Sequence, residues 1–233
     1  MKMCKLLSTI TRWCIPALLP VVLLLSCSGS SPVAGGGTGV GNGVVSGMVS
    51  YRDGSPAAGI PVHVRPDFYV QDTTGAPASP REGLIVDCTT DSSGVFQVDS
   101  LTSGSYSIEI SAPDSNTGTL YRCNIQDTET VALENRILEP LTTLSGAIKL
   151  SGLPEYGWVQ IYGIEALGKI DGNGDFTIDH LPIGDCSHHE CEYKLRILID
   201  SSGVVVAKDY ELEWDSSGTL VEIELEAEDL HDD

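Results

Sequence analysis

The sequence predicts an all-β fold with two tandem antiparallel β-sandwich domains, which follow a signal peptide and a Gly-rich tether. Three observations lead to this prediction. A pattern of 14 residues occurs twice, at 91–104 and at 171–184, with its spacings preserved. Short segments that alternate apolar and polar residues recur between turn signals, as in sandwich folds. After the N-terminal leader, no segment shows the periodicity of a convincing helix.

The repeated pattern reads Asp-x-x-Gly-x-Phe-x-(Val/Ile)-Asp-x-Leu-x-x-Gly, and its two copies lie 80 residues apart. Its Asp and Gly favour a tight reversal, because the carboxylate bonds backbone amides two residues on and glycine accepts a positive φ. Its Phe and Val/Ile are two positions apart, so both point to one face of a strand. We therefore expect each copy to be the hairpin at the centre of a small β-domain.

Residues 1–26 have the layout of a secretory signal: Lys2, Lys5 and Arg12 precede an apolar run over 15–25, and no residue is acidic. The run is too short for a comfortable transmembrane helix. An ordinary secretory signal and a lipoprotein signal are the two interpretations of this segment.

The motif Leu24-Leu25-Ser26-Cys27 resembles the lipobox of bacterial lipoproteins. The resemblance implies that Cys27 becomes the first mature residue and carries the lipid, including palmitate. Two or three acyl chains anchor a protein stably where a single chain is marginal. Ser28 after the cysteine favours the outer membrane, on its periplasmic or surface face. Residues 27–43 are then the lipidated cysteine and a flexible tether, because 35–43 are mostly glycine.

The charge of the chain excludes one class of partner. The formal net charge is −20. Removing the leader takes away three cations and no carboxylate, which leaves ten cations against 33 carboxylates, a charge of −23. A body this acidic repels phosphate backbones, and the sequence contains no basic stripe. We predict no nucleic-acid partner.

The strand pattern divides the mature chain into predicted domains at 44–140 and 141–233. Each opens with a Ser-Gly step inside an apolar strand, at Gly47 and at Gly146. The last strands, 210–214 and 221–225, alternate strictly and carry carboxylates on one face. We expect them to form an edge hairpin that its charge keeps soluble, followed by an acidic tail.

Four cysteines remain beyond Cys27, and they are disulfide candidates because export places them where disulfides persist. They allow three pairings. Proximity in sequence favours Cys88 with Cys123 and Cys186 with Cys191. The segment Cys186-Ser-His-His-Glu-Cys191 also concentrates metal ligands, but its spacing does not suit zinc, so we favour the disulfide.

Two further motifs have a structural and a functional interpretation. Asp171-Gly-Asn-Gly-Asp175 is similar to a calcium loop but lacks the downstream Glu of an EF-hand, so we interpret it as a turn and predict no metal. Trp158, Gln160 and Tyr162 share one strand face, and Tyr156 precedes them. This row either fills the core or forms a ligand platform of Tyr156, Trp158 and Tyr162. We favour the core.

Four motifs in order resemble the carboxypeptidase regulatory-like domain, which is related in fold to transthyretin. The motifs are Gly47-x-Val49, Asp53-Gly-x-Pro56-x-x-Gly59-x-x-Val62, Thr90-Asp-x-x-Gly-x-Phe96 and Leu101-x-x-Gly104-x-Tyr106. The resemblance covers 44–111 well and 143–199 more loosely, because the second copy lacks the Asp-Gly-x-Pro segment. It implies a transthyretin-like or Ig-like sandwich that serves as a non-catalytic accessory or binding module on secreted and outer-membrane proteins.

The sequence offers little support for catalysis or for a cofactor. It contains no Gly-x-Ser-x-Gly elbow, His-Glu-x-x-His pair or Gly-rich phosphate loop. Transthyretin relatives that hydrolyse 5-hydroxyisourate end in Tyr-Arg-Gly-Ser, whereas Tyr121-Arg-Cys-Asn lies mid-chain here and His63 is isolated. We expect a lipid-anchored accessory protein of the cell envelope, a structural or binding module whose partner is a glycan or another envelope protein. The alternative is a carbohydrate-binding lipoprotein that assists polysaccharide capture.

Overall fold

The computed structural model describes residues 41–71, 73, 85–126, 128–149, 156–184, 192–201, 204–213, 220–224 and 231–232. The predicted leader, Cys27 and most of the tether lie outside these residues, as do Cys186 and Cys191. Tyr156 is described through its backbone alone. In the described residues no helix is long or apolar enough to cross a membrane.

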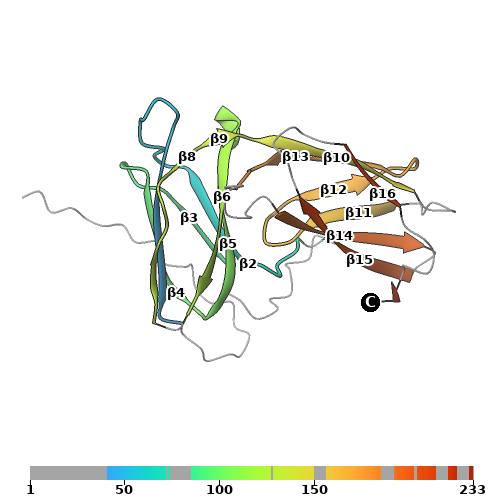
Figure 1. The fold of residues 1–233 in the computed structure, drawn as a ribbon, viewed down its shortest axis with the longest axis horizontal. Helices are drawn as coiled ribbons and strands as arrows, with labels where there is room; N and C mark the ends of the chain where they lie inside the picture. Colours follow the sequence, from blue (N-terminus) through green and yellow to red (C-terminus); the bar gives the residue numbers. More distant parts are fainter. Residues whose placement is uncertain are drawn as a thin grey trace, which may run out of the picture.

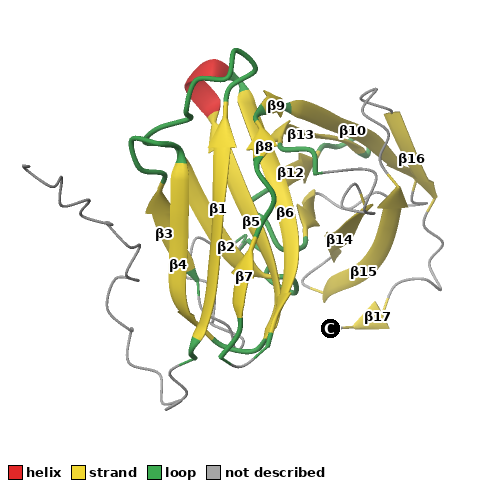
Figure 2. Ribbon diagram, turned by 60° about the vertical axis from the view of Figure 1, so that its left-hand side comes forward, coloured by secondary structure: helices red, strands yellow, loops and turns green. Residues whose placement is uncertain are grey.

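The first half of the chain forms two facing sheets (Figure 1). The four-stranded sheet contains β1 (Gly43–Ser50), β4 (Val95–Leu101), β7 (Thr130–Ala132) and β8 (Arg136–Ile137). The five-stranded sheet has the order β3 (Val86–Thr89), β2 (Pro61–Pro66), β5 (Gly104–Ala112), β6 (Thr117–Ile125), β9 (Glu139–Pro140). A short 3-10 helix, η1 (Pro113–Ser115), joins β5 to β6 and is drawn in red in Figure 2.

The second half repeats this two-sheet arrangement. Its three-stranded sheet has the order β13 (Asp175–Leu181), β10 (Thr142–Lys149), β16 (Leu220–Glu224). Its five-stranded sheet has the order β12 (Leu167–Ile170), β11 (Tyr156–Ile161), β14 (Glu192–Ser201), β15 (Val204–Glu213), β17 (His231–Asp232). In both halves the first strand also pairs in parallel with late strands: β1 with β7 and β8, and β10 with β16.

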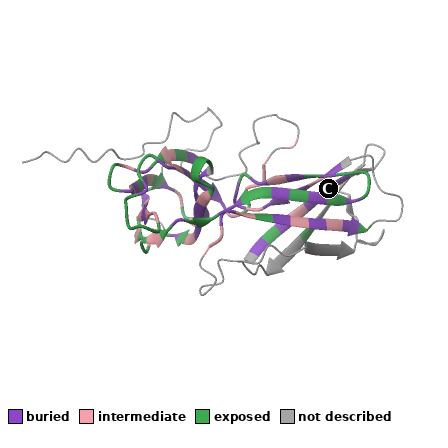
Figure 3. Cartoon of the chain, turned by 90° about the horizontal axis from the view of Figure 1, so that it is seen from above, coloured by how far each residue is buried: buried purple, intermediate pink, exposed green. Residues whose placement is uncertain are grey.

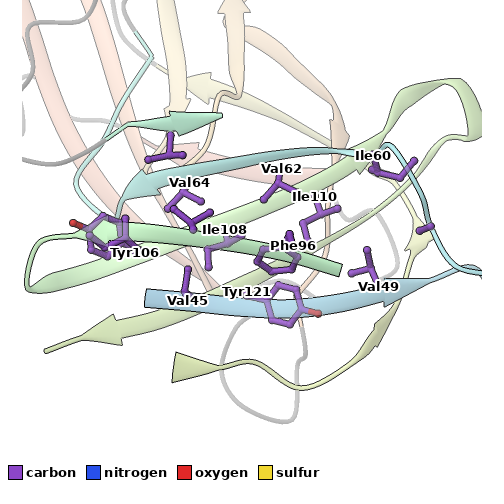
Figure 4. Close-up of a cluster of buried hydrophobic side chains, with 14 of the residues drawn as sticks. Val45, Val49, Ile60, Val62, Val64, Phe96, Tyr106, Ile108, Ile110 and Tyr121 are labelled. Atoms are coloured by element: carbon purple, nitrogen blue, oxygen red, sulfur yellow. The ribbon is translucent and has the colours of Figure 1, made fainter. Parts of the chain in front are cut away.

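Each pair of sheets encloses its own hydrophobic core. The first core contains Phe96 from one sheet facing Val62 and Ile108 from the other (Figure 4). The second contains Phe176 with Val159 and others. Figure 3 shows buried positions running through the strands of both halves. The predicted all-β fold with two sandwiches is confirmed, while the domain boundaries at 44–140 and 141–233 stay predictions.

A glycine on the first strand makes room for the repeated Phe in each half. Gly47 lies opposite Phe96, and Gly146 lies opposite Phe176. A methyl group on Gly47 would stand 2.7 Å from the ring of Phe96, closer than packed carbons come. The Ser-Gly step that marks each predicted domain is therefore the packing partner of the repeated Phe.

The repeated turn is built as predicted, but it does not close a hairpin. Asp91 Oδ1 accepts backbone hydrogen bonds from Ser93 and Val95 at 2.7 and 3.0 Å. Asp171 Oδ1 accepts the two equivalent bonds at 2.8 and 3.0 Å. The strands on either side of each turn belong to opposite sheets, β3 and β4 in one copy and β12 and β13 in the other. The expectation of a central hairpin was wrong: each copy is an arch that carries the chain across the core.

The expected edge hairpin at the end of the chain was also wrong. β15 pairs with β14 in the five-stranded sheet, whereas β16 pairs in parallel with β10 in the opposite sheet. The alternating pattern identified both strands correctly. The pattern gave no information on the sheet to which each strand belongs. Alternation shows that one face of a strand is buried, but it does not show which other strand pairs with it.

The five-stranded sheet of the first sandwich is buried on both faces. Tyr106, Ile108 and Ile110 of β5 face the first core. Ser107 of the opposite face is only 1% exposed, and Leu120 of the neighbouring strand β6 belongs to the core of the second sandwich. The second sandwich therefore packs directly against the outer face of β2, β5 and β6.

The geometry of the repeated arch can be tested at the glycine that ends its first turn. Gly94 has φ +77°, and a methyl group there would stand 2.2 Å from the carbonyl oxygen of Val49. Gly54 has φ +82° with open space around it. We expect Gly54→Ala to cost about 1 kcal/mol of unfolding free energy, from the left-handed backbone alone. Gly94→Ala should cost at least about twice as much, as measured by urea unfolding. Equal costs for the two substitutions would contradict the arch geometry.

Candidate functional site

A polar cluster lies between the two sandwiches and centres on Arg65. Val62 and Val64 of β2 turn into the first core, so the alternation of the strand directs Arg65 to the outer face, toward the second sandwich. There the residue is 2% exposed. A buried guanidinium is costly unless its donors and its charge are matched.

Five hydrogen bonds match all five N–H groups of Arg65. Nη1 donates to the carbonyl oxygens of Val64 and Val86, both at 3.0 Å. Nη2 donates to Asp87 Oδ1 at 2.6 Å and also to Glu165 Oε1. Nε donates to the same Glu165 oxygen at 3.0 Å. Because Glu165 belongs to the second sandwich, this one side chain joins the two halves.

The segment that follows Arg65 continues the contact. The ring of Tyr69 lies with its centroid 5.6 Å from the Arg65 guanidinium carbon. The N–H of Gly163 donates to the Tyr69 carbonyl oxygen at 2.8 Å. A methyl group on Gly163 would stand 2.4 Å from Ser107 Oγ, which shows how closely the β11–β12 turn approaches β5.

His63 is not isolated, contrary to the sequence interpretation. Its Nδ1 lies 2.7 Å from Asp87 Oδ1, so the carboxylate that receives Arg65 also contacts an imidazole. Burial on its own would raise the pKa of Asp87, but the hydrogen bonds from His63 and Arg65 outweigh it and hold that pKa below its ordinary value. The carboxylate therefore stays charged and keeps its place in the cluster.

A cavity of about 300 Å³ opens beside this cluster, between the two sandwiches. Its polar wall contains Glu109 and Ser111 of β5 together with Glu165, Asp179 and His180 of the second sandwich. Burial raises the pKa of Glu109 above its ordinary value; the charge of Glu165 adds to this effect, while His63 and a hydrogen bond from Ser111 oppose it. Cavities at such junctions with a few convergent polar groups are common ligand sites.

A β-bulge places two of these residues at the cavity. On β13 the pairing runs from Ile178 opposite Leu144 to Leu181 opposite Thr142, so one extra residue enters the strand. His180 takes the strain, with φ +60°. Bulges redirect side chains in this way and recur beside functional sites. The first sandwich has an equivalent bulge with Ser100 at φ +66°.

The aromatic row divides as the strand alternation requires. Val159 and Ile161 are fully buried in the second core. Trp158, Gln160 and Tyr162 lie on the opposite face, where Trp158 and Tyr162 are partly exposed. Tyr162 donates to Asp209 Oδ1 at 3.0 Å, and Lys194 Nζ lies 4.9 Å from the centroid of its ring. The structure therefore puts this row outside the core, where we expected it to fill the core.

Gln160, in the middle of the row, is covered by the segment after β2. It is 2% exposed, and its Nε2 donates to the Gln71 carbonyl oxygen. The partly exposed residues of the row are thus Trp158 and Tyr162. Whether they form a platform with Tyr156 stays a prediction.

The register rules out the predicted Cys88–Cys123 pairing. Cys88 on β3 faces Val62, and Cys123 on β6 faces Tyr106. Strands β2 and β5 lie between them, so the cysteines are about 14 Å apart across the sheet alone. A disulfide requires Cα atoms within about 7 Å. The Cys186–Cys191 pairing lies outside the described residues and stays a prediction.

The structure supplies a role for Asp171 in the turn, where its carboxylate accepts backbone amides. Among the residues that the structure describes, no group of three or more His, Cys, Asp or Glu side chains is placed to hold a metal ion. Sequence reasoning missed Arg65, Glu109 and Glu165 as site residues. The available signal was a charged residue at the end of an alternating strand, in the segment Ile60-Pro-Val-His-Val-Arg65.

Comparison with known proteins adds little about function. No family model and no curated protein matches the chain. Among solved structures it is similar to the TIE protein of Bacillus anthracis (18% identity, TM-score 0.30), a match that covers 80% of this chain and 34% of that one. The chain thus spans about a third of the length of that protein.

Two further solved structures show the same level of similarity. One is GBS52, the minor pilin of Streptococcus agalactiae (14% identity, TM-score 0.31, covering 78% of this chain and 94% of that one). The other is a candidate carbohydrate-binding protein from Pseudomonas aeruginosa (18% identity, TM-score 0.24, covering 41% and 90%). With TM-scores below 0.5, these likenesses support no conclusion about function.

The Arg65 cluster predicts that two Arg–Glu pairs of the chain differ in importance. Arg65→Met leaves two carbonyl oxygens and the Glu165 carboxylate without their donor, so we expect a loss of about 2–3 kcal/mol of unfolding free energy. Arg52→Met removes an exposed pair with Glu139 and should cost less than about 1 kcal/mol. Urea unfolding followed by tryptophan fluorescence compares them. Similar losses would show that Arg65 is no more than a surface ion pair.

Proposed function

We propose that the chain is a lipid-anchored accessory protein of the cell envelope, a non-catalytic structural or binding module held at the outer membrane. The observation that carries this proposal is the buried junction. Arg65, with all of its donors used and Glu165 of the other sandwich as a partner, fixes the two sandwiches against each other. A module fixed in this way presents its outer surfaces in a constant geometry, which suits display or docking.

The N-terminal sequence supports the anchoring part of the proposal. The lipobox resemblance at Leu24-Leu25-Ser26-Cys27 would supply the lipid, and the glycine-rich composition of the sequence that precedes β1 is typical of a tether. The motifs that resemble the carboxypeptidase regulatory-like domain favour an accessory role. The partner of such a module is a glycan or another envelope protein.

Lipid attachment has a direct test. In a bacterial host labelled with radioactive palmitate, we expect the wild-type chain to incorporate label and to partition into detergent. Cys27→Ala should lose both properties, because no other cysteine follows a lipobox. Cys14→Ala is the matched control and should keep the label, since Cys14 leaves with the predicted signal. Label retained by Cys27→Ala, or absent from the wild type, would overturn the anchored placement.

Carbohydrate binding is the second candidate function, and one observation favours it. Trp158 lies on the outer face of β11 and Tyr162 follows the strand directly, and both partly exposed residues lie away from the core formed by Val159 and Ile161. Two partly exposed aromatic rings on one side of a sheet suit stacking against sugar units. Lys194 and Asp209 place polar groups beside the second ring.

Affinity electrophoresis in a panel of soluble glycans tests this second function. We expect at least one glycan to retard the wild-type protein. Trp158→Ala should weaken that binding at least about fivefold, the scale of an aromatic binding residue. Ile137→Ala removes a 48% exposed side chain on the first sandwich and should leave binding unchanged. If no glycan retards the protein, or if Trp158→Ala binds as well as the wild type, the platform is excluded.

A further inference from the structure

The cavity between the sandwiches combines an apolar floor with a half-buried carboxylate, Glu109, that pairs with no lysine or arginine of the described residues. Asp179 likewise has no such pair, but it is exposed. Its floor is formed by Leu141, Ile164, Ala166, Leu181 and Pro182. All five residues are buried, and the hydrophobic floor continues into the second core through Ile164, Ala166 and Leu181. A polar rim over an apolar floor is the usual composition of a small-ligand site.

The three carboxylates of the rim differ in their ion-pair and hydrogen-bond partners. Glu165 is paired with Arg65. Asp179 Oδ1 accepts a hydrogen bond from Thr143 Oγ1 at 2.9 Å. Glu109 receives a hydrogen bond from Ser111 at 3.2 Å, but in the described part of the chain it forms no ion pair with any lysine or arginine. It lines the cavity as a half-buried carboxylate, with the imidazole of His63 opposite it in the β2–β5 pairing and no lysine or arginine of the described residues paired with it.

The surroundings favour a cation as the missing partner. The net charge of the chain is −20, so its long-range field attracts positive groups and repels anions. A half-buried carboxylate gains more from an ion pair than an exposed one does, because water screens the pair less. A metal ion is not favoured, because the described residues hold no group of three ligands placed for one.

We propose that this cavity binds a primary ammonium group on an apolar stem, with Glu109 as its anionic partner and Ile164 and Ala166 against the methylenes. A lysine side chain of a partner protein and a free alkylamine share this chemistry. The ammonium offers three donors, which suit the oxygens of Glu109 and Ser111, and the four-carbon stem of lysine suits the floor. This proposal rests on the proposed role as a binding module and names the group that the module recognises.

The residues come from both sandwiches, so the site exists only while the junction is closed. Glu109 and Ser111 lie on β5, whereas Ile164, Glu165 and Ala166 lie in and after the β11–β12 turn. Arg65 is a positioning residue for this site, since it holds Glu165 beside the cavity without contacting the proposed ligand.

Titration calorimetry on the full mature chain in detergent tests the proposal with small probes. N-acetyl-lysine methylamide represents a lysine side chain of a partner, and n-butylamine represents a free amine. N-acetyl-norleucine methylamide has the same stem without the charge. We expect at least one amine probe to bind, and the norleucine probe to bind at least tenfold more weakly than the lysine probe. Binding of the lysine probe alone points to a side chain of a partner, and binding of n-butylamine alone points to a free amine. Binding of both supports recognition of the ammonium and stem that the two sources share.

Two variants assign the binding to the cavity. Glu109→Gln keeps the shape and removes the charge, and it should weaken amine binding at least tenfold. Asp114→Asn removes an exposed carboxylate elsewhere on the first sandwich and should change it less than twofold. Ala166→Leu fills the floor without changing any charge and should also abolish binding. Far-UV circular dichroism verifies that each variant is folded.

Several results would overturn the inference. One is equal affinity for the norleucine and lysine probes, and another is unchanged affinity for the amine in Glu109→Gln. A third is an equal loss of affinity in Glu109→Gln and Asp114→Asn, because this would indicate non-specific attraction to an acidic protein. Absence of binding by both amines would also reject it. None of these outcomes affects palmitate labelling of Cys27 or retardation by glycans, so failure of this inference is distinguishable from failure of the proposed function.

Discussion

The structure depends on a buried guanidinium that one sandwich cannot satisfy alone. Arg65 is 2% exposed, and a charge at that depth requires partners within reach. Its own half supplies the carbonyl oxygens of Val64 and Val86 and the carboxylate of Asp87; the other half supplies Glu165, which takes two of the five hydrogen bonds. Separating the halves would remove the two hydrogen bonds and the ion pair that Arg65 forms with Glu165. The position of the second sandwich therefore depends on one buried charge.

This constraint decides which faces of the molecule are free. Because the second sandwich covers β2, β5 and β6, the central sheet is buried on both faces, and polar residues such as Ser107 lie inside the junction. The same closure forms the cavity beside Glu109. It leaves Trp158 on β11 and Tyr162 directly after that strand partly exposed. Both candidate binding surfaces therefore result from the contact between the sandwiches. The cavity beside Glu109 offers a carboxylate, whereas Trp158 and Tyr162 offer aromatic rings.

The sequence predicted what local chemistry controls. Asp91 and Asp171 form the turns that their spacing indicated, and each repeated Phe packs in its own core opposite a glycine. What it could not predict is partnership between distant segments. A turn signal does not say whether the strands beside it share a sheet, so the arches were expected to be hairpins. Sequence proximity likewise suggested Cys88 with Cys123, which two intervening strands keep apart. Arg65 and Glu165 are 100 residues apart, and neither carries a motif.

The Arg65 junction should make the two sandwiches one rigid body. Residual dipolar couplings of backbone amides in weakly aligned solution can show this, because they report the orientation of each sandwich independently. For a rigid junction, couplings from 43–140 and from 142–213 fit a single alignment tensor with the orientation described here. Two tensors that differ in magnitude or direction would contradict it, since they would show sandwiches that move independently despite Arg65.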